Sequence, residues 1–276
     1  MTREPQPVRR AFRVAATLVL LCTFAPCRRG GPALRVCADP NNLPFSNDRG
    51  EGFENRIAEL LAQDRRAALQ YTWWAQRRGF VRNTLGSGTC DIVMGMAGGA
   101  EIVLTTRPYY RSTYLFVSRE DRKLRLGSLD DPALRDLRIG VQMIGDDFAN
   151  TPPAHALASR GLVQNVIGYS VLGDYSRPHP LSTIVDAVAD GQIDAALVWG
   201  PEAGYFAKHA AVPLRLAAIT PPHDRTLPFA FDIAMAVRKR DSRLRDELND
   251  FLERRRTEID AILSDYGVPR VDAPRS

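Results

Sequence analysis

Motifs that mark the common classes of enzyme are missing from this 276-residue sequence. It contains no His-Glu-x-x-His metal motif, no Gly-x-Ser-x-Gly nucleophile elbow and no glycine-rich phosphate loop. No acid and base pair has a recognisable catalytic spacing either. The four histidines are scattered along the chain, at His155, His179, His209 and His223. These absences argue against an enzyme, and no metal site is expected.

The sequence also lacks a surplus of positive charge once its first 33 residues are set aside. The net charge of +5 comes from residues 1–33, which hold six arginines and one glutamate. The rest of the chain carries 31 basic and 31 acidic side chains. A folded part with no excess of cations cannot hold phosphates strongly, which excludes nucleic-acid binding.

Long hydrophobic runs are scarce, and the run near the N-terminus covers only residues 14–25. A membrane-spanning helix needs about 20 apolar residues. Because this run follows a basic segment ending at Arg13, it predicts an export signal over residues 1–33, cleaved between about residues 25 and 33. The mature protein is therefore expected in the periplasm and not embedded in the membrane. The Arg9-Arg10 pair fits either twin-arginine export or an ordinary arginine-rich signal of the general secretory route.

Cysteine is sparse, since only Cys37 and Cys90 remain after the leader is removed. In an exported protein, two cysteines favour one disulfide. Two buried thiols are the alternative that the residues alone leave open.

From residue 34 onward, short apolar runs alternate with helical patterns, which is typical of an α/β fold. Strands are expected at residues 34–38, 69–74, 91–96, 137–142, 163–171, 195–199, 214–219 and 229–237. Residues 107–117 form an extended aromatic segment, and residues 80–85 a helix or turn. Helices are expected at residues 53–63, 153–160, 181–189 and 202–209, with a single long helix from Asp241 or Ser242 to Gly267.

Four segments make this order specific. They are residues 34–45 (LRVCADPNNLPF) with Gly52-Phe53-Glu54, 86–95 (GSGTCDIVMG), 106–112 (TRPYYRS) and 184–200 (IVDAVADGQIDAALVWG). Together they resemble periplasmic solute-binding proteins of the amino-acid-binding type over nearly all of residues 34–268. The resemblance implies a bilobal, type II periplasmic-binding-protein-like fold, with two α/β lobes joined by two crossovers and a cleft between them. Lobe 1 would comprise residues 34–114 and 226–276, and lobe 2 residues 115–225.

That fold places the segments of Cys37 and Cys90 side by side, which favours the disulfide. Two departures from the amino-acid-binding pattern bear on the ligand. Residues 99–103 (GAEIV) lack the arginine that grips an α-carboxylate, and Trp199-Gly200-Pro201 stands where an aspartate holds the α-ammonium. A buried ligand charge without a partner is costly, so simple amino acids are not expected ligands.

Longer strings resemble one branch of this family. They are residues 37–47 (CADPNNLPFSN), 72–80 (TWWAQRRGF), 105–112 (TTRPYYRS), 140–142 (GVQ) through 150–154 (NTPPA), and the Trp199-Gly200-Pro201 triplet. The branch is the MoxJ/XoxJ type, solute-binding-like proteins associated with quinoprotein methanol dehydrogenase. The resemblance implies a non-enzymatic periplasmic accessory protein that binds a PQQ-dependent methanol dehydrogenase and aids its maturation or cofactor loading. No resident cofactor is expected, and PQQ would be a transient ligand. The alternative is the substrate-binding component of an ABC transporter for a small organic solute.

Loop position in that fold selects the residues expected to face the cleft or a partner. The aromatic ones are Phe45, Trp73, Trp74, Tyr109, Tyr110, Trp199 and Tyr205. Adjacent strand residues face opposite sides, so one of the two neighbouring tryptophans is expected inward and the other at the cleft or surface. The polar ones are Asp39, Asn41, Asn42, Gln142 and Asp146. Arg107 is expected to bind carboxylates, of which PQQ has three. Asp146-Asp147 lacks a third metal ligand and fits helix capping better.

Overall fold

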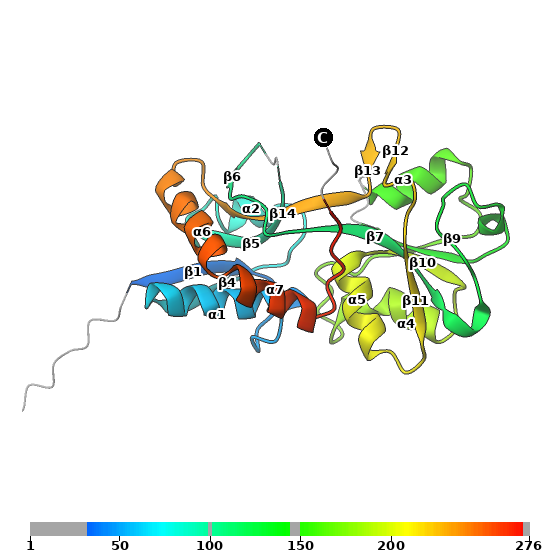
Figure 1. The fold of residues 1–276 in the computed structure, drawn as a ribbon, viewed down its shortest axis with the longest axis horizontal. Helices are drawn as coiled ribbons and strands as arrows, with labels where there is room; N and C mark the ends of the chain where they lie inside the picture. The colour runs from blue at the N-terminus through cyan, green and yellow to red at the C-terminus, as the bar shows by residue number, and fades with distance from the viewer. Residues whose placement is uncertain (1–31, 99–100, 144–149, 273–276) are drawn as a thin grey trace, which may run out of the picture. The chain divides into compact units, whose positions relative to one another are not determined.

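Parallel strands form the centre of the first lobe in the computed structural model, which describes residues 32–98, 101–143 and 150–272 (Figure 1). Strand β1 (Ala33–Ala38) pairs in parallel with β4 (Ala68–Trp73) on one side and β5 (Ile92–Ala97) on the other. Helix α1 (Phe53–Arg65) buries an apolar stripe of side chains that includes Phe53, Ile57 and Leu61. The short elements of this lobe are β2 (Asn41–Asn42), β3 (Ser46–Asn47), α2 (Phe80–Asn83) and β6 (Leu104–Thr105).

The second lobe has its own sheet, covered by helices on both faces. Strand β10 (Ala195–Trp199) pairs in parallel with β8 (Ile139–Gln142), which in turn pairs with β9 (Val166–Tyr169). The core on one face includes α3 (Pro152–Ser159), and the core on the other includes α4 (Thr183–Ala189) and α5 (Gly200–His209) (Figure 1). The remaining elements are η1 (Glu120–Arg122), η2 (Pro132–Arg135), η3 (Pro180–Ser182) and β11 (Leu214–Ala218).

Two strands connect the lobes. Strand β7 (Tyr110–Arg119) pairs with β14 (Ala230–Val237) up to Thr113 and with β10 from Tyr114 onward. The chain returns from β11 through the hairpin of β12 (His223–Asp224) and β13 (Leu227–Pro228) into β14, which then pairs with β5. The fold is thus the expected bilobal α/β architecture with two crossovers. The lobe boundaries at residues 114/115 and 225/226 stay a prediction.

The disulfide expected between Cys37 and Cys90 is present, with the two Cα atoms 5.4 Å apart. Cys37 lies in β1, opposite Val93 of β5, and Cys90 shortly precedes β5. Both cysteines belong to a small buried cluster with Phe80 and Leu85. The bridge therefore connects the start of β5 to the neighbouring strand β1 in a buried part of the first lobe.

The final helix, expected as one, is two helices that meet at Arg255. Helix α6 (Ser242–Arg254) packs on β14 and β6, whereas α7 (Arg256–Asp265) packs on α1. The apolar stripe continues through both, but the surfaces beneath the two halves differ, and the break lets each half follow its own surface. Asp241 is the N-cap residue of α6, although its side chain makes no capping hydrogen bond.

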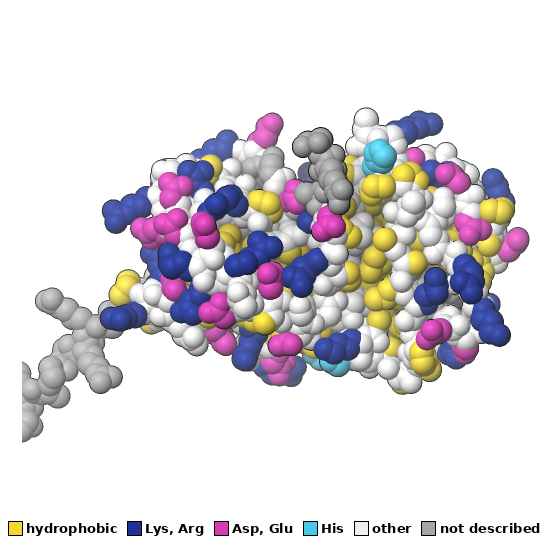
Figure 2. All heavy atoms as spheres, viewed as in Figure 1, with side chains coloured by type: hydrophobic (Ala, Val, Ile, Leu, Met, Phe, Trp, Pro, Cys, Tyr) yellow, Lys and Arg dark blue, Asp and Glu magenta, His cyan; other side chains and the backbone are white. Residues whose placement is uncertain are grey.

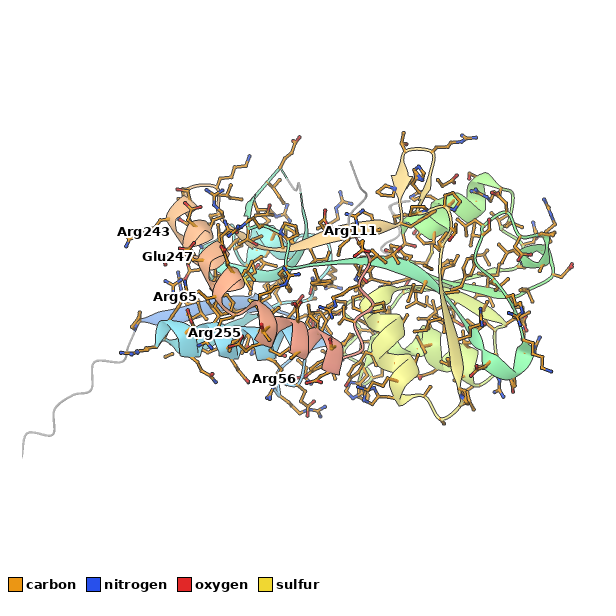
Figure 3. The ribbon with its side chains drawn as sticks, in the orientation of Figure 1. Arg56, Arg65, Arg111, Arg243, Glu247 and Arg255 are labelled. Carbon is orange, nitrogen blue, oxygen red and sulfur yellow. A yellow bond between two sulfur atoms is a disulfide. The ribbon has the colours of Figure 1, made fainter. Side chains whose placement is uncertain are left out.

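Arginines on the surface of the first lobe are matched by acids. Figure 2 shows basic and acidic side chains interspersed over α6 and α7, and Figure 3 labels several of the arginines with Glu247. Glu247 lies 2.8 Å from Arg65 and 3.1 Å from Arg243, and Arg255 lies 3.1 Å from the carboxylate of Asp64. Positive charge on this face is therefore neutralised locally. In the described part of the chain, no helix is both long and apolar enough to cross a membrane.

Candidate functional site

A cavity of about 320 Å³ is lined by residues from both lobes. Its aromatic lining consists of Phe45, Tyr110, Tyr114, Trp199 and Phe231. Its polar, uncharged lining consists of Asn42, Gln76, Gln142 and Thr151. Two acids, Glu54 and Glu202, and the small or aliphatic Gly95, Met96, Ala97, Leu172 and Ile233 complete it. Strands β5, β8 and β10 reach the cavity with their carboxyl ends, the edge at which ligands bind in open α/β sheets.

Aromatic rings from several elements line the cavity. The ring centroid of Trp199 lies 5.2 Å from that of Tyr114 and 5.9 Å from that of Phe231. Phe45, from the loop after β2, packs on Phe53 of α1 with ring centroids 5.4 Å apart. Three strands and a loop thus present aromatic surface to the same space.

Five of the residues expected at the cleft line this cavity: Asn42, Phe45, Tyr110, Gln142 and Trp199. The Asn42 side chain donates to Oε1 of Gln76 at 2.9 Å, which fixes both amides at the cavity wall. The backbone oxygen of Gln142 accepts from Oγ1 of Thr151 at 3.0 Å, holding the end of β8 to the start of α3. Asp146 and its neighbour Asp147 lie outside the described residues.

Asp39 and Asn41 do not line the cavity but organise its rim. The Asp39 carboxylate accepts backbone N–H groups of Asn41 at 2.9 Å and Gln76 at 2.7 Å, so it shapes the loop after β1. The Asn41 amide donates to the carbonyl oxygens of Asp174 at 3.2 Å and Arg177 at 2.9 Å, and its Oδ1 accepts from the backbone of His179 at 3.3 Å. Asn41 therefore joins a first-lobe loop to a second-lobe loop.

The other aromatic residues expected at the cleft lie elsewhere. Tyr109 is buried, and its hydroxyl donates to the carbonyl oxygen of Met94 at 3.0 Å. Trp73 is half-buried and stacks on Tyr71 with ring centroids 4.5 Å apart. Trp74 is 44% exposed, and so the two adjacent tryptophans do differ in environment.

Two further expected residues are engaged with distant parts of the first lobe. The guanidinium of Arg107 lies 3.1 Å from the carboxylate of Glu253 on the surface, not at the cavity. The ring of Tyr205 stacks on that of Tyr266 at 5.7 Å, because the segment after α7 folds back onto α5. Gly204 is what allows this approach, since a Cβ there would overlap the carbonyl oxygen of Gly267.

The sequence reasoning missed the two acids of the cavity, Glu54 and Glu202. Glu54 lies in the first turn of α1 and Glu202 in the first turn of α5, and both are buried. Burial raises the pKa of each carboxyl to about 8, because its charged form loses water. Gly95 faces Glu54 so closely that a Cβ on Gly95 would overlap Oε1 of the carboxyl. An acid in the first turn of a helix is common for electrostatic reasons alone, so the sequence signal was weak.

The chemistry of the cavity follows from what lines it. No arginine, lysine or histidine is among the described lining residues, and Oε2 of Glu202 is buried with no hydrogen-bond partner in that part of the chain. The described residues also contain no cluster of three or more side chains able to hold a metal ion. The cavity thus offers aromatic faces, amides and two carboxyls, a set that does not suit a ligand carboxylate.

Comparison with known proteins agrees with the fold. Residues 34–268 match the family described as bacterial extracellular solute-binding proteins, family 3. The chain is 34% identical to Protein MoxJ of Methylorubrum extorquens over 250 residues, which covers 86% of this chain and 81% of that protein.

Two solved structures are also similar. The periplasmic binding protein XoxJ from Methylobacterium extorquens AM1 has 35% identity and a TM-score of 0.72, covering 87% of this chain and all of that one. MxaJ from Methlophaga aminisulfidivorans MPT has 29% identity and a TM-score of 0.76, with the same coverage of this chain. With a family match over most of its length and a relative above 30% identity, the chain belongs to family 3 of the bacterial extracellular solute-binding proteins and is of the MoxJ type.

Proposed function

We propose that this protein is a non-enzymatic, periplasmic accessory protein of a PQQ-dependent methanol dehydrogenase system, which binds the dehydrogenase and aids its maturation or cofactor loading. Membership of the MoxJ type supports the proposal, together with the branch-specific residues 37–47 and the Trp199-Gly200-Pro201 triplet. The export signal predicted over residues 1–33 supports the periplasmic location. The described cavity-lining residues include no serine, cysteine, lysine or histidine, which supports a binding role over catalysis.

A pair of exposed aromatic side chains at the junction of the lobes carries the binding part of the proposal. Trp74 is 44% exposed and Tyr175 is 52% exposed. The Trp74 backbone donates to the carbonyl oxygen of Ala38 at 2.9 Å, and the Tyr175 hydroxyl donates to Oδ1 of Asp39 at 3.3 Å. The two residues thus lie near the same end of β1. Large aromatic residues carry much of the energy of protein interfaces, so we assign the docking surface to this rim.

The test is a pull-down with mature protein, starting near residue 34, from periplasm of the source organism grown on methanol. Recovery of a quinoprotein dehydrogenase that falls at least tenfold in Trp74→Ala, in a variant with unchanged circular dichroism, supports the assignment. Val163→Ala is the matched control, because Val163 is 55% exposed but belongs to the second lobe near β9. Failure to recover any dehydrogenase with the unaltered protein would remove the accessory role.

Transient binding of PQQ stays a prediction, and the cavity described above is a poor place for it. PQQ carries carboxylates, which would meet Glu54 and Glu202 with no cation among the described lining residues. We propose that any PQQ contact uses arginines outside the cavity. Equilibrium titration with PQQ, followed by its absorbance, would place it in the cavity if Glu202→Gln strengthened binding.

The second candidate is the substrate-binding component of a transporter for a small organic solute. The cavity volume of about 320 Å³ favours it, since it falls within the range of small-molecule sites. A transport receptor would bind one solute at micromolar concentration and recover no dehydrogenase. The pull-down and a solute screen on the same preparation therefore separate the two functions.

A further inference from the structure

Two buried acids face one cavity from opposite lobes without a cationic partner. The exposed fractions of Glu54 and Glu202 are 7% and 5%, so both are more than nine-tenths buried. The other two buried acids of the described residues have partners, and the Asp39 carboxylate accepts the backbone N–H groups of Asn41 and Gln76. Asp194, which is 9% exposed, lies within 3.2 Å of both Arg122 and Arg138. Glu202 differs from both, because its buried Oε2 has no hydrogen-bond partner among the described residues.

The neighbours of the two carboxyls are aromatic. Burial is the main cause that raises the pKa values of Tyr110 and Tyr114, and the acids raise them further, Glu54 and Glu202 for Tyr110 and Glu202 for Tyr114. Both tyrosines line the cavity together with Trp199. The faces of such rings attract cations, and the attraction is strongest where water is excluded.

We propose that the cavity binds a small organic cation, a protonated amine or a quaternary ammonium, with Glu54 and Glu202 as counter-ions and the rings of Tyr110, Tyr114 and Trp199 around it. A carboxylate ligand would find no cation among the described lining residues, and the acids would repel it once they ionise. An apolar ligand would leave the buried Oε2 of Glu202 without a partner. A cation satisfies the acids and the rings together. The cavity volume of about 320 Å³ is at the lower end of small-molecule sites, which favours a small ion.

Proton release is the signature of this site. With a pKa of about 8, each carboxyl of the free protein is mostly protonated at pH 7. A cation binds the ionised form, so binding expels protons and tightens as the pH rises towards 8. The other titratable groups that face these acids are Tyr71, Tyr109, Tyr110 and Tyr114, whose pKa values are all raised by burial above 10. They do not ionise in this interval, so protons released below pH 8 come from the carboxyls.

The experiment is calorimetric titration of the mature protein with tetramethylammonium and with n-butylammonium at pH 6 and pH 8. Each titration is run in two buffers of different ionisation enthalpy, which counts the protons released. We expect affinity at least tenfold higher at pH 8 for one or both ions, with proton release at pH 7. The neutral analogue n-butanol is expected to bind at least tenfold more weakly than n-butylammonium at pH 8.

Variants assign the effect to the two acids. Glu202→Gln and Glu54→Gln keep the side-chain shape, and each is expected to weaken cation binding at pH 8 at least tenfold and to reduce the proton count. Glu59→Gln is the matched control on the same helix as Glu54, where the carboxylate of Glu59 lies 3.4 Å from Arg56 at the surface. Infrared detection of the protonated carboxyl band gives a second readout, since the band is expected to shrink when the cation is added to the unaltered protein.

Three results would overturn the proposal: no binding of either ion at millimolar concentration, affinity independent of pH, or unchanged affinity in both glutamine variants. The proposal does not rest on the accessory role, because the pull-down tests the rim at Trp74, whereas the titration tests the cavity. Loss of cation binding and loss of the dehydrogenase are thus separate outcomes.

Discussion

Replacing Glu202 by glutamine is expected to stabilise the protein, and by more at pH 8 than at pH 5. Burial raises the pKa of Glu202 to about 8, compared with 4.5 for an ordinary glutamate. Over that interval the folded protein holds the proton more tightly than the unfolded chain does. The stability that this group contributes is therefore fully present below pH 4.5 and is lost as the pH rises through 8.

The size of the effect follows from the shift. One pKa unit corresponds to about 1.4 kcal/mol, so the free energy of unfolding should fall by roughly 3 to 4 kcal/mol between pH 5 and pH 8 because of this carboxyl. Glutamine has nearly the same shape and no charge to desolvate. The stability gap between the variant and the unaltered protein should thus widen by about 1 kcal/mol per pH unit over that range.

Urea unfolding at four pH values from 5 to 8, followed by circular dichroism, measures this gap. Glu59→Gln serves as the control for replacing a glutamate by glutamine, because its carboxyl lies at the surface 3.4 Å from Arg56. A gap for Glu202→Gln that stays constant, or narrows as the pH rises, would refute the reasoning that burial keeps this carboxyl protonated.

Three other changes test contacts that hold the two lobes and their strands in place around the cavity. Replacing Cys37 and Cys90 by serine should lower the free energy of unfolding by about 4 kcal/mol, since the bridge spans 53 residues. Urea unfolding without a reducing agent measures this difference. Gly204→Ala should cost about 1 to 3 kcal/mol in the same assay, because its Cβ would overlap the carbonyl oxygen of Gly267. Asn41→Ala removes three hydrogen bonds between the lobes and should enlarge the radius of gyration in X-ray scattering; an unchanged radius would contradict that role.

Residues whose place depends on strand order could be predicted from the sequence. The strand at residues 195–199 was expected with the bounds that the structure has, and ligands gather at the carboxyl ends of such strands. That rule placed Trp199 and Gln142 at the cavity, and the loop after β1 placed Asn42 there. The disulfide followed in the same way, because parallel neighbours bring Cys37 close to Cys90.

Residues whose place depends on long-range packing could not be predicted. Arg107 pairs with Glu253, 146 residues further along the chain, and nothing near Arg107 in the sequence signals that partner. Tyr205 stacks on Tyr266 because the chain after α7 returns to α5. In both positions a local motif was taken to indicate the cleft. The side chain instead contacts a segment of the first lobe that is distant in the sequence.

The two cavity acids explain the missing amino-acid clamp in physical terms. A clamp for an amino acid must offer a cation to the carboxylate and an anion to the ammonium. Residues 99–103 contain no arginine, Trp199 replaces the acid at the end of β10, and the described cavity lining has no cation. The acidic groups of the cavity are instead Glu54 and Glu202. Glu202 lies in the first turn of α5, directly beyond the end of β10. A site with acidic groups and no cationic complement disfavours every zwitterion. The missing arginine and the two cavity acids therefore shift the preference of the site in the same direction. Both disfavour a ligand carboxylate and favour a cation.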